Sequence, residues 1–113
     1  MIHVENLIDG KFVKTEENFE DISPADFSVI ATIPRTKQIG DAVTAAKRSF
    51  DEWSALSIEQ RCDWLDKIAD ELETQIDEVA RLEALDTGKP IEVALNVDAS
   101  RSVNNFRFFA DFG

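Results

Sequence analysis

The sequence predicts an α+β chain, in which a small antiparallel β element is followed by about three amphipathic helices. Before Pro34, short runs of β-branched and aromatic residues are separated by turn-forming residues, which is typical of strands. After Pro34, apolar residues recur every three or four positions, which is typical of helices. We therefore expect residues 1–34 to form the β element and residues 35–113 to form the helices.

The β element is expected to contain two pairs of strands, each joined by a turn. Asp9-Gly10 favours a two-residue hairpin turn, because both residue types tolerate positive φ. Ser23-Pro24-Ala25-Asp26 favours the second turn, in which the proline fixes φ. The expected pairs are residues 6–8 with 11–13 and residues 18–22 with 29–33.

Two helices are expected after the β element. Thr36 can cap the first, and Ser57 with Gln60 has the S-x-x-Q form of a capping box at the start of the second. Thr74-Gln75 interrupts the second apolar stripe, and Gly88 marks its stop. The first stripe comprises Ile39, Ala42, Val43, Ala46, Phe50 and Trp53, and the second comprises Leu65, Ile68, Ala69, Leu72, Ile76, Val79 and Ala80.

A third helix is expected to have Pro90 as its first residue, since the missing N–H of proline costs nothing there. Arg101 and Asn105 lie one turn apart on one face of this helix. The positions predicted to face inward are Val93, Ala94, Val97, Val103, Phe106 and Phe109. The last residues are rich in phenylalanine, whereas the end of a complete domain is usually polar, so we expect the chain to continue or to dock on a partner.

Composition and charge exclude several classes of partner. Twelve Lys and Arg against 23 Asp and Glu give a net charge of -11, which repels nucleic acid and anionic membranes. No apolar run approaches the roughly 20 residues of a membrane span, and the start has no secretion signal. One cysteine excludes an intramolecular disulfide, which fits a reducing cytoplasm. We therefore expect a cytoplasmic chain, and from its charge and lack of apolar runs we expect no nucleic-acid or membrane partner.

Cys62 is the one candidate nucleophile, and a structural role fits it better. Free cysteines are commonly buried packing residues, and the single histidine, His3, is expected at a frayed N-terminus where it cannot serve as a base. Trp53 is in phase with the first stripe and is expected to pack, whereas Trp64 is out of phase and could cover another helix or a subunit neighbour.

Residues 82–90, Leu-Glu-Ala-Leu-Asp-Thr-Gly-Lys-Pro, resemble the L-E-x-L-D-T-G-K-P signature of aldehyde dehydrogenases. Ile8-Asp9-Gly10, Ser23-Pro24-Ala25 and Arg107-Phe108-Phe109-Ala110 match other landmarks of this family in the same order. The resemblance covers essentially the whole chain. Residues 101–110 look most like the branch that acts on 2-amino- or 2-hydroxymuconate semialdehyde.

The resemblance implies an α/β, Rossmann-like fold, of which residues 1–113 form the N-terminal and incomplete part of the cofactor-binding domain. Members use NAD or NADP, a Cys thiolate that attacks the aldehyde, and a Glu base that helps to hydrolyse the thioester to a carboxylic acid. They are usually homodimers or homotetramers. Those catalytic residues belong to later motifs, and this chain has no glycine-rich phosphate loop, so we assign it no catalytic or cofactor-binding residue.

Arg101 is the candidate substrate-binding residue, because the resemblance places this position at the substrate entrance. Its guanidinium could bind the carboxylate of an acidic semialdehyde, with Asn105 facing the same passage. Alternatively, Arg101 is a surface residue paired with Asp98 or with an acidic neighbour. Asn104 and Arg107 are expected to be structural.

Asp86 is the candidate ion ligand, because its charge is unfavourable at a helix C-terminus. The following Gly88-Lys89-Pro90 could be an ordinary helix end. The resemblance implies instead that this Asp, with backbone carbonyls matched here by Asp21 and Ile22, binds a monovalent cation, Na⁺ or K⁺.

Two hypotheses of function follow. The first is that the chain is part of an NAD(P)-dependent aldehyde dehydrogenase, whose partners are an aldehyde substrate and the remainder of its own domain. The alternative is a truncated, non-catalytic helical protein that binds a partner chain through its aromatic C-terminal end.

Overall fold

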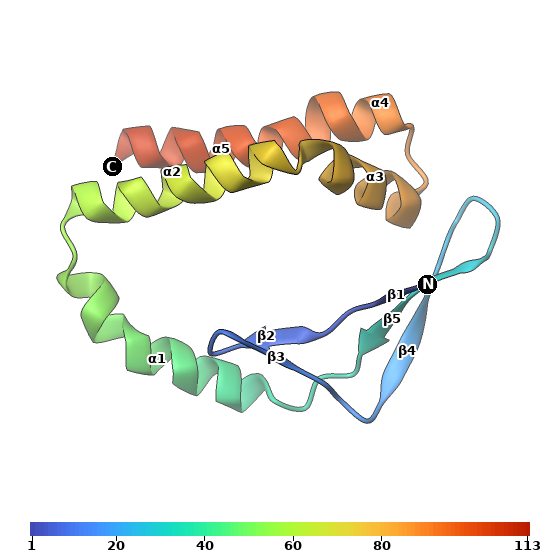
Figure 1. Ribbon diagram of the computed structural model, residues 1–113, viewed down its shortest axis with the longest axis horizontal. Helices are drawn as coiled ribbons and strands as arrows, with labels where there is room; N and C mark the ends of the chain where they lie inside the picture. The colour runs from blue at the N-terminus through green and yellow to red at the C-terminus, as the bar shows by residue number, and fades with distance from the viewer. The chain divides into compact units, whose positions relative to one another are not determined.

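Two compact units make up the computed structural model, which describes all residues from Met1 to Gly113. The first unit is Met1–Ala55 and the second is Leu56–Gly113. Strands come first along the chain and helices follow, so the predicted α+β class is confirmed (Figure 1). None of the helices has the length and apolar character that crossing a lipid bilayer requires.

The first unit holds a three-stranded sheet of order β1-β5-β4 and a two-stranded hairpin, β2-β3. Both predicted antiparallel pairings are confirmed. The sheet also contains β1, which pairs in parallel with β5 and was not predicted, because two residues are too few to show a strand period. The strands are β1 (Ile2–His3), β2 (Asn6–Ile8), β3 (Lys11–Val13), β4 (Asn18–Ile22) and β5 (Val29–Pro34).

The hairpin turn between β2 and β3 is the tight one that the sequence predicts. Asp9 and Gly10 have φ values of 53° and 71°, and positive φ at both central positions is what a type I′ turn requires. The N-terminus, however, is not frayed. His3 is paired in β1, and its Nδ1 lies 2.8 Å from the Oγ1 of Thr32, so that expectation was wrong.

Helix α1 (Ile39–Ala55) begins after Thr36, which is therefore not its N-cap as expected. The Oγ1 of Thr36 instead accepts a hydrogen bond from the Nδ2 of Asn6 at 2.7 Å, which ties the segment before α1 to β2. The Nη2 of Arg48 lies 2.6 Å from the Oδ2 of Asp9 and joins α1 to the hairpin turn. Because α1 buries none of its residues, packing of its apolar stripe and its tryptophan stays a prediction.

The predicted start of the second helix, the break in its apolar stripe and its stop are confirmed. Ser57 and Gln60 form the capping box of α2 (Ile58–Thr74), with side-chain to backbone hydrogen bonds of 3.1 and 2.9 Å. The apolar stripe breaks at Gln75, and α3 (Ile76–Thr87) follows. Gly88 ends α3 in the left-handed conformation, with φ of 74°, as its lack of a Cβ allows.

The expected third helix is a continuous run of α4 (Ile91–Val93), η1 (Ala94–Ala99) and α5 (Ser100–Phe112). Pro90 precedes the run with ψ of 139°, which is not helical, so it is the N-cap and not the first helical residue. The middle segment η1 is a π-helix, in which hydrogen bonds span five residues instead of four. No sequence pattern predicted it.

The π-helix changes which residues face inward. The buried residues of the run are Ala94, Ala99, Val103 and Ala110, and the first step between them is five residues. Within the π-helix, this step of five leaves Val97 42% exposed, although the α-helical period predicted it to face inward. Val93 before the π-helix and Phe109 in α5 are 43% and 60% exposed, so their predicted inward placement was also wrong. Val103 and Ala94 are buried as predicted.

Small side chains bring the helices of the second unit together. In Figure 1, α5 runs back alongside α2, and these two helices are in contact along their length. Helix α3 packs against η1 through Ala80, Ala94 and Ala99, each at most 3% exposed. Alanine lets two backbones approach closely, and the surrounding partly buried residues are Ile76, Val79, Ala84 and Leu95.

Candidate functional site

The structure brings the two predicted substrate-binding residues together. Arg101 and Asn105, one turn apart on α5, are both exposed and line one depression of about 280 Å³. The depression lies where α3 meets η1 and the start of α5. Its other lining residues are Val79, Glu83, Asp98, Ala99 and Ser102.

Arg101 has no ion-pair partner in the structure. Its expected alternative partner, Asp98, is occupied, because the Oδ2 of Asp98 lies 2.6 Å from the Nζ of Lys89. The surface pairing of Arg101 with Asp98 is therefore not observed. The guanidinium keeps its five N–H donors for another acceptor.

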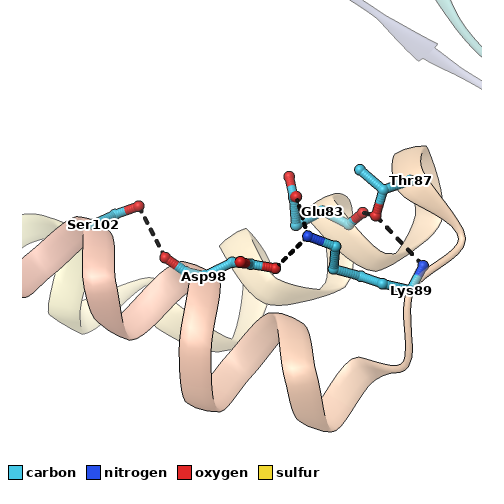
Figure 2. A network of polar contacts seen from close by, with 5 residues as sticks. All are labelled: Glu83, Thr87, Lys89, Asp98 and Ser102. Atoms are coloured by element: carbon cyan, nitrogen blue, oxygen red, sulfur yellow. Dashed lines mark hydrogen bonds and ion pairs between the residues drawn. The ribbon is translucent and has the colours of Figure 1, made fainter.

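A network of polar contacts involves the carboxylates of Glu83 and Asp98 (Figure 2), which line the same depression as Arg101. Lys89 bridges Asp98 of η1 and Glu83 of α3, whose Oε1 lies 3.3 Å from Nζ. The Oγ1 of Thr87 donates to the carbonyl of Glu83 at 2.7 Å, and the Oγ of Ser102 donates to the carbonyl of Asp98 at 3.1 Å. The hydrogen bond to Asp98, and then that to Glu83, raises the pKa of Lys89 above its ordinary value.

Sequence reasoning missed this network. It interpreted Lys89 only as part of an ordinary helix end, whereas the ammonium pairs with Glu83 of that helix and with Asp98, nine residues later. No periodic pattern marks the pair, because the two residues come together only through the π-helix and the packing of η1 on α3.

The predicted ion ligands are divided between the two units. Asp21 and Ile22 lie at the end of β4, where the register with β5 shifts between them, and Asp86 is exposed near the end of α3. The cation site therefore stays a prediction. No group of three or more His, Cys, Asp or Glu residues is placed to hold a metal ion.

Cys62 is half-buried on α2 and forms no disulfide. A Cβ atom placed on Gly113 would lie 2.6 Å from its Sγ, so the thiol packs against the end of α5. Trp64 is 50% exposed, with the Nζ of Lys67 lying 4.5 Å from the ring centroid. Both residues are placed as packing and surface residues, and neither lines the depression.

Comparison with known proteins identifies the group to which this sequence is related. Residues 12–113 match the Aldehyde dehydrogenase family, which is most of the chain. The chain belongs to the aldehyde dehydrogenase family. The expected resemblance is thereby confirmed.

Individual relatives place this aldehyde dehydrogenase chain more closely. The 2-aminomuconic 6-semialdehyde dehydrogenase of Pseudomonas sp is 38% identical over 94% of this chain and 22% of its own length. The 2-aminomuconic semialdehyde dehydrogenase of Danio rerio is 40% identical over 95% of this chain and 22% of its own length. The predicted likeness to the muconic semialdehyde branch is confirmed.

The fold of this aldehyde dehydrogenase chain also matches solved structures. The NAD⁺ complex of the aldehyde dehydrogenase from Bacillus cereus superposes with a TM-score of 0.92 at 36% identity, over 96% of this chain and 23% of that one. The structural neighbours are aldehyde dehydrogenases, whose fold is Rossmann-like, as the resemblance implied. The chain spans less than a quarter of the length of the relatives it matches.

Proposed function

We propose that this chain is the N-terminal part of an NAD(P)-dependent aldehyde dehydrogenase that oxidises a carboxylate-bearing aldehyde of the muconic semialdehyde class to a carboxylic acid. The observation that carries the proposal is the similarity of nearly the whole chain to two 2-aminomuconic semialdehyde dehydrogenases. The nicotinamide cofactor would accept the hydride. We assign residues 1–113 to the cofactor-binding domain, with no catalytic residue of their own.

The role of this chain is to receive the substrate. Arg101 supports that role, because its guanidinium lines a depression and has no competing ion pair. Its planar fork matches the two oxygens of a carboxylate, and Asn105 on the next turn supplies an amide that can donate to the same group. An acidic semialdehyde would thus be held by its carboxylate, while the aldehyde reaches residues outside this chain.

Replacement of Arg101 in the complete enzyme tests the substrate class. Arg101→Ala should raise KM for a carboxylate-bearing semialdehyde by about tenfold or more, because a charge-assisted bidentate contact is lost. KM for a neutral aldehyde should stay within about twofold of the wild-type value. Arg101→Lys is the matched variant, which keeps the charge and loses the fork. An equal rise in both KM values would contradict the carboxylate contact.

We also propose a structural Na⁺ or K⁺ held by Asp86 and the backbone carbonyls of Asp21 and Ile22. The donor set fits a hard monovalent ion, since it offers only oxygen atoms. The register shift between Asp21 and Ile22 supports it, because a bulge leaves one residue outside the regular ladder. The melting temperature of the complete enzyme should rise when choline is exchanged for K⁺ or Na⁺, and Asp86→Asn should remove that rise.

A second candidate function is docking of a partner through the end of α5. Phe108, Phe109 and Phe112 are 60%, 60% and 80% exposed, and the ring of Phe108 contacts the other two. In the leading proposal, this surface packs against the remainder of its own domain. The complete enzyme would be a homodimer or a homotetramer. Measurement of molecular mass by light scattering separates the two candidate functions. A docking protein would form a complex with its partner chain even when the rest of a dehydrogenase is absent.

A further inference from the structure

The depression around Arg101 contains two carboxylates as well as the guanidinium. Glu83 and Asp98 both line it. Asp98 precedes Arg101 by three positions in one continuous helical run, a spacing at which opposite charges commonly pair. A carboxylate of the protein that pairs with Arg101 would compete with a carboxylate of the substrate for the same N–H donors.

Lys89 forms ion pairs with both of these carboxylates. Its Nζ lies 2.6 Å from the Oδ2 of Asp98 and 3.3 Å from the Oε1 of Glu83 (Figure 2). Neither carboxylate forms an ion pair with Arg101. The side chain of Lys89 is 33% exposed, compared with 88% for Lys14 and 73% for Lys37, so its ion pairs are partly shielded from solvent. The two carboxylates are thus neutralised in part by one ammonium.

The backbone fixes Lys89 in this position. Gly88 turns the chain through the left-handed conformation immediately before it, and Pro90 immediately after it has a ring-locked φ of -57°. The backbone N–H of Lys89 also donates to the Oγ1 of Thr87 at 3.4 Å. On the other side, the π-helix keeps Ala94 and Ala99 both against α3, and Asp98 belongs to that segment.

We propose that Lys89 is a positioning residue that determines substrate specificity: by pairing with Asp98 and Glu83, it keeps Arg101 free to bind a carboxylate of the substrate. The inference rests on the proposed function, since it takes Arg101 as the substrate contact. Without the ammonium, Asp98 would turn to Arg101, and the depression would carry an excess of negative charge that repels an anionic aldehyde.

Lys89→Met in the complete enzyme is the test, because methionine retains the length of the side chain and removes its charge. KM for a carboxylate-bearing semialdehyde should rise about fivefold or more, while KM for a neutral aldehyde and both kcat values stay within about twofold. Lys89→Met/Asp98→Asn should recover most of the loss, because the competing carboxylate is gone. Lys67→Met, on the exposed face of α2, is the control for a change of net charge.

A second measurement does not depend on turnover. Phenylglyoxal modifies accessible guanidinium groups, and peptide mass spectrometry reports the rate at Arg101. Modification of Arg101 should slow in Lys89→Met and return to the wild-type rate in Lys89→Met/Asp98→Asn. An unchanged modification rate in Lys89→Met would overturn the inference.

The outcomes also separate this inference from the proposed function. If Arg101→Ala raises KM for the acidic substrate and Lys89→Met does not, the substrate class stands and the role of Lys89 is wrong. If Lys89→Met raises KM for acidic and neutral aldehydes equally, Lys89 is structural only. If Arg101→Ala does not discriminate between the substrates, the proposed substrate class itself fails.

Discussion

The Nη1 of Arg107 on α5 lies 2.9 Å from the Oδ1 of Asp70 on α2, a residue 37 positions earlier in the chain. The Nη2 of the same guanidinium lies 2.6 Å from Glu73, one turn further along α2. One side chain thus links the two longest contacting helices of the second unit, as its predicted structural role requires. The hydrogen bond to Asp70, and then that to Glu73, raises the pKa of Arg107.

Arg107→Met should therefore lower the urea midpoint of the second unit, and the loss should be smaller at 1 M salt than at low salt. The two carboxylates are 68% and 62% exposed, so salt screens much of the attraction. Arg81→Met removes a guanidinium that pairs only within α3, and it is the control. If the loss in urea midpoint does not depend on salt, Arg107 stabilises the second unit through packing of its aliphatic stem and not through its charge.

Ser57→Ala should destabilise the second unit by about 1 kcal/mol, because the capping box satisfies two backbone donors at the start of α2. Ser57→Asp keeps an acceptor at the same position and should retain most of the stability. Urea unfolding followed by circular dichroism measures both variants. An Ala variant as stable as the wild type would mean that water replaces the cap without loss.

These caps and turns were predictable because their causes are local. Asp9-Gly10 allows positive φ at two successive positions, Ser57 and Gln60 lie three residues apart, and Gly88 ends a helix. Each feature depends on the types of a few neighbouring residues, so it can be predicted from the amino-acid sequence alone.

The π-helix and the Lys89 network were not predictable in the same way. A step of five between Ala94 and Ala99 is stabilised by close packing on Ala80, which is a contact between separate helices. Arg101 and Asn105 were placed together correctly because a spacing of four is the same on any α-helix. Lys89 and Asp98 meet only after that packing has formed, so no spacing rule finds them.

Ala80→Leu tests this packing directly. Ala80 is 1% exposed against Ala94 and Ala99, which are 0% and 3% exposed, so a larger side chain has no room. Overpacking should cost the second unit about 1–3 kcal/mol, measured by urea unfolding. Ala84→Leu, at the partly buried edge of the same contact, should cost less. Equal losses at the two positions would contradict the close approach of α3 and η1.

Asp26 provides a test of pH dependence in the loop between β4 and β5. The Oγ of Ser28 donates to its Oδ1 at 2.7 Å and the backbone N–H of Ser28 at 3.0 Å, and these two bonds hold the pKa of Asp26 below its ordinary value. A lowered pKa in the folded state stabilises the fold above the unfolded pKa, and this contribution is lost as pH falls through the folded pKa, below about pH 4. Ser28→Ala removes the larger cause, so the pKa of Asp26 should rise toward its ordinary value while the backbone bond keeps part of the shift. NMR titration of the Asp26 carboxyl carbon measures this pKa. The difference in free energy of unfolding between Ser28→Ala and the wild type should shrink at pH values where Asp26 is protonated in both the folded and the unfolded state. The same pKa in the variant as in the wild type would show that the Ser28 hydroxyl does not hold this loop.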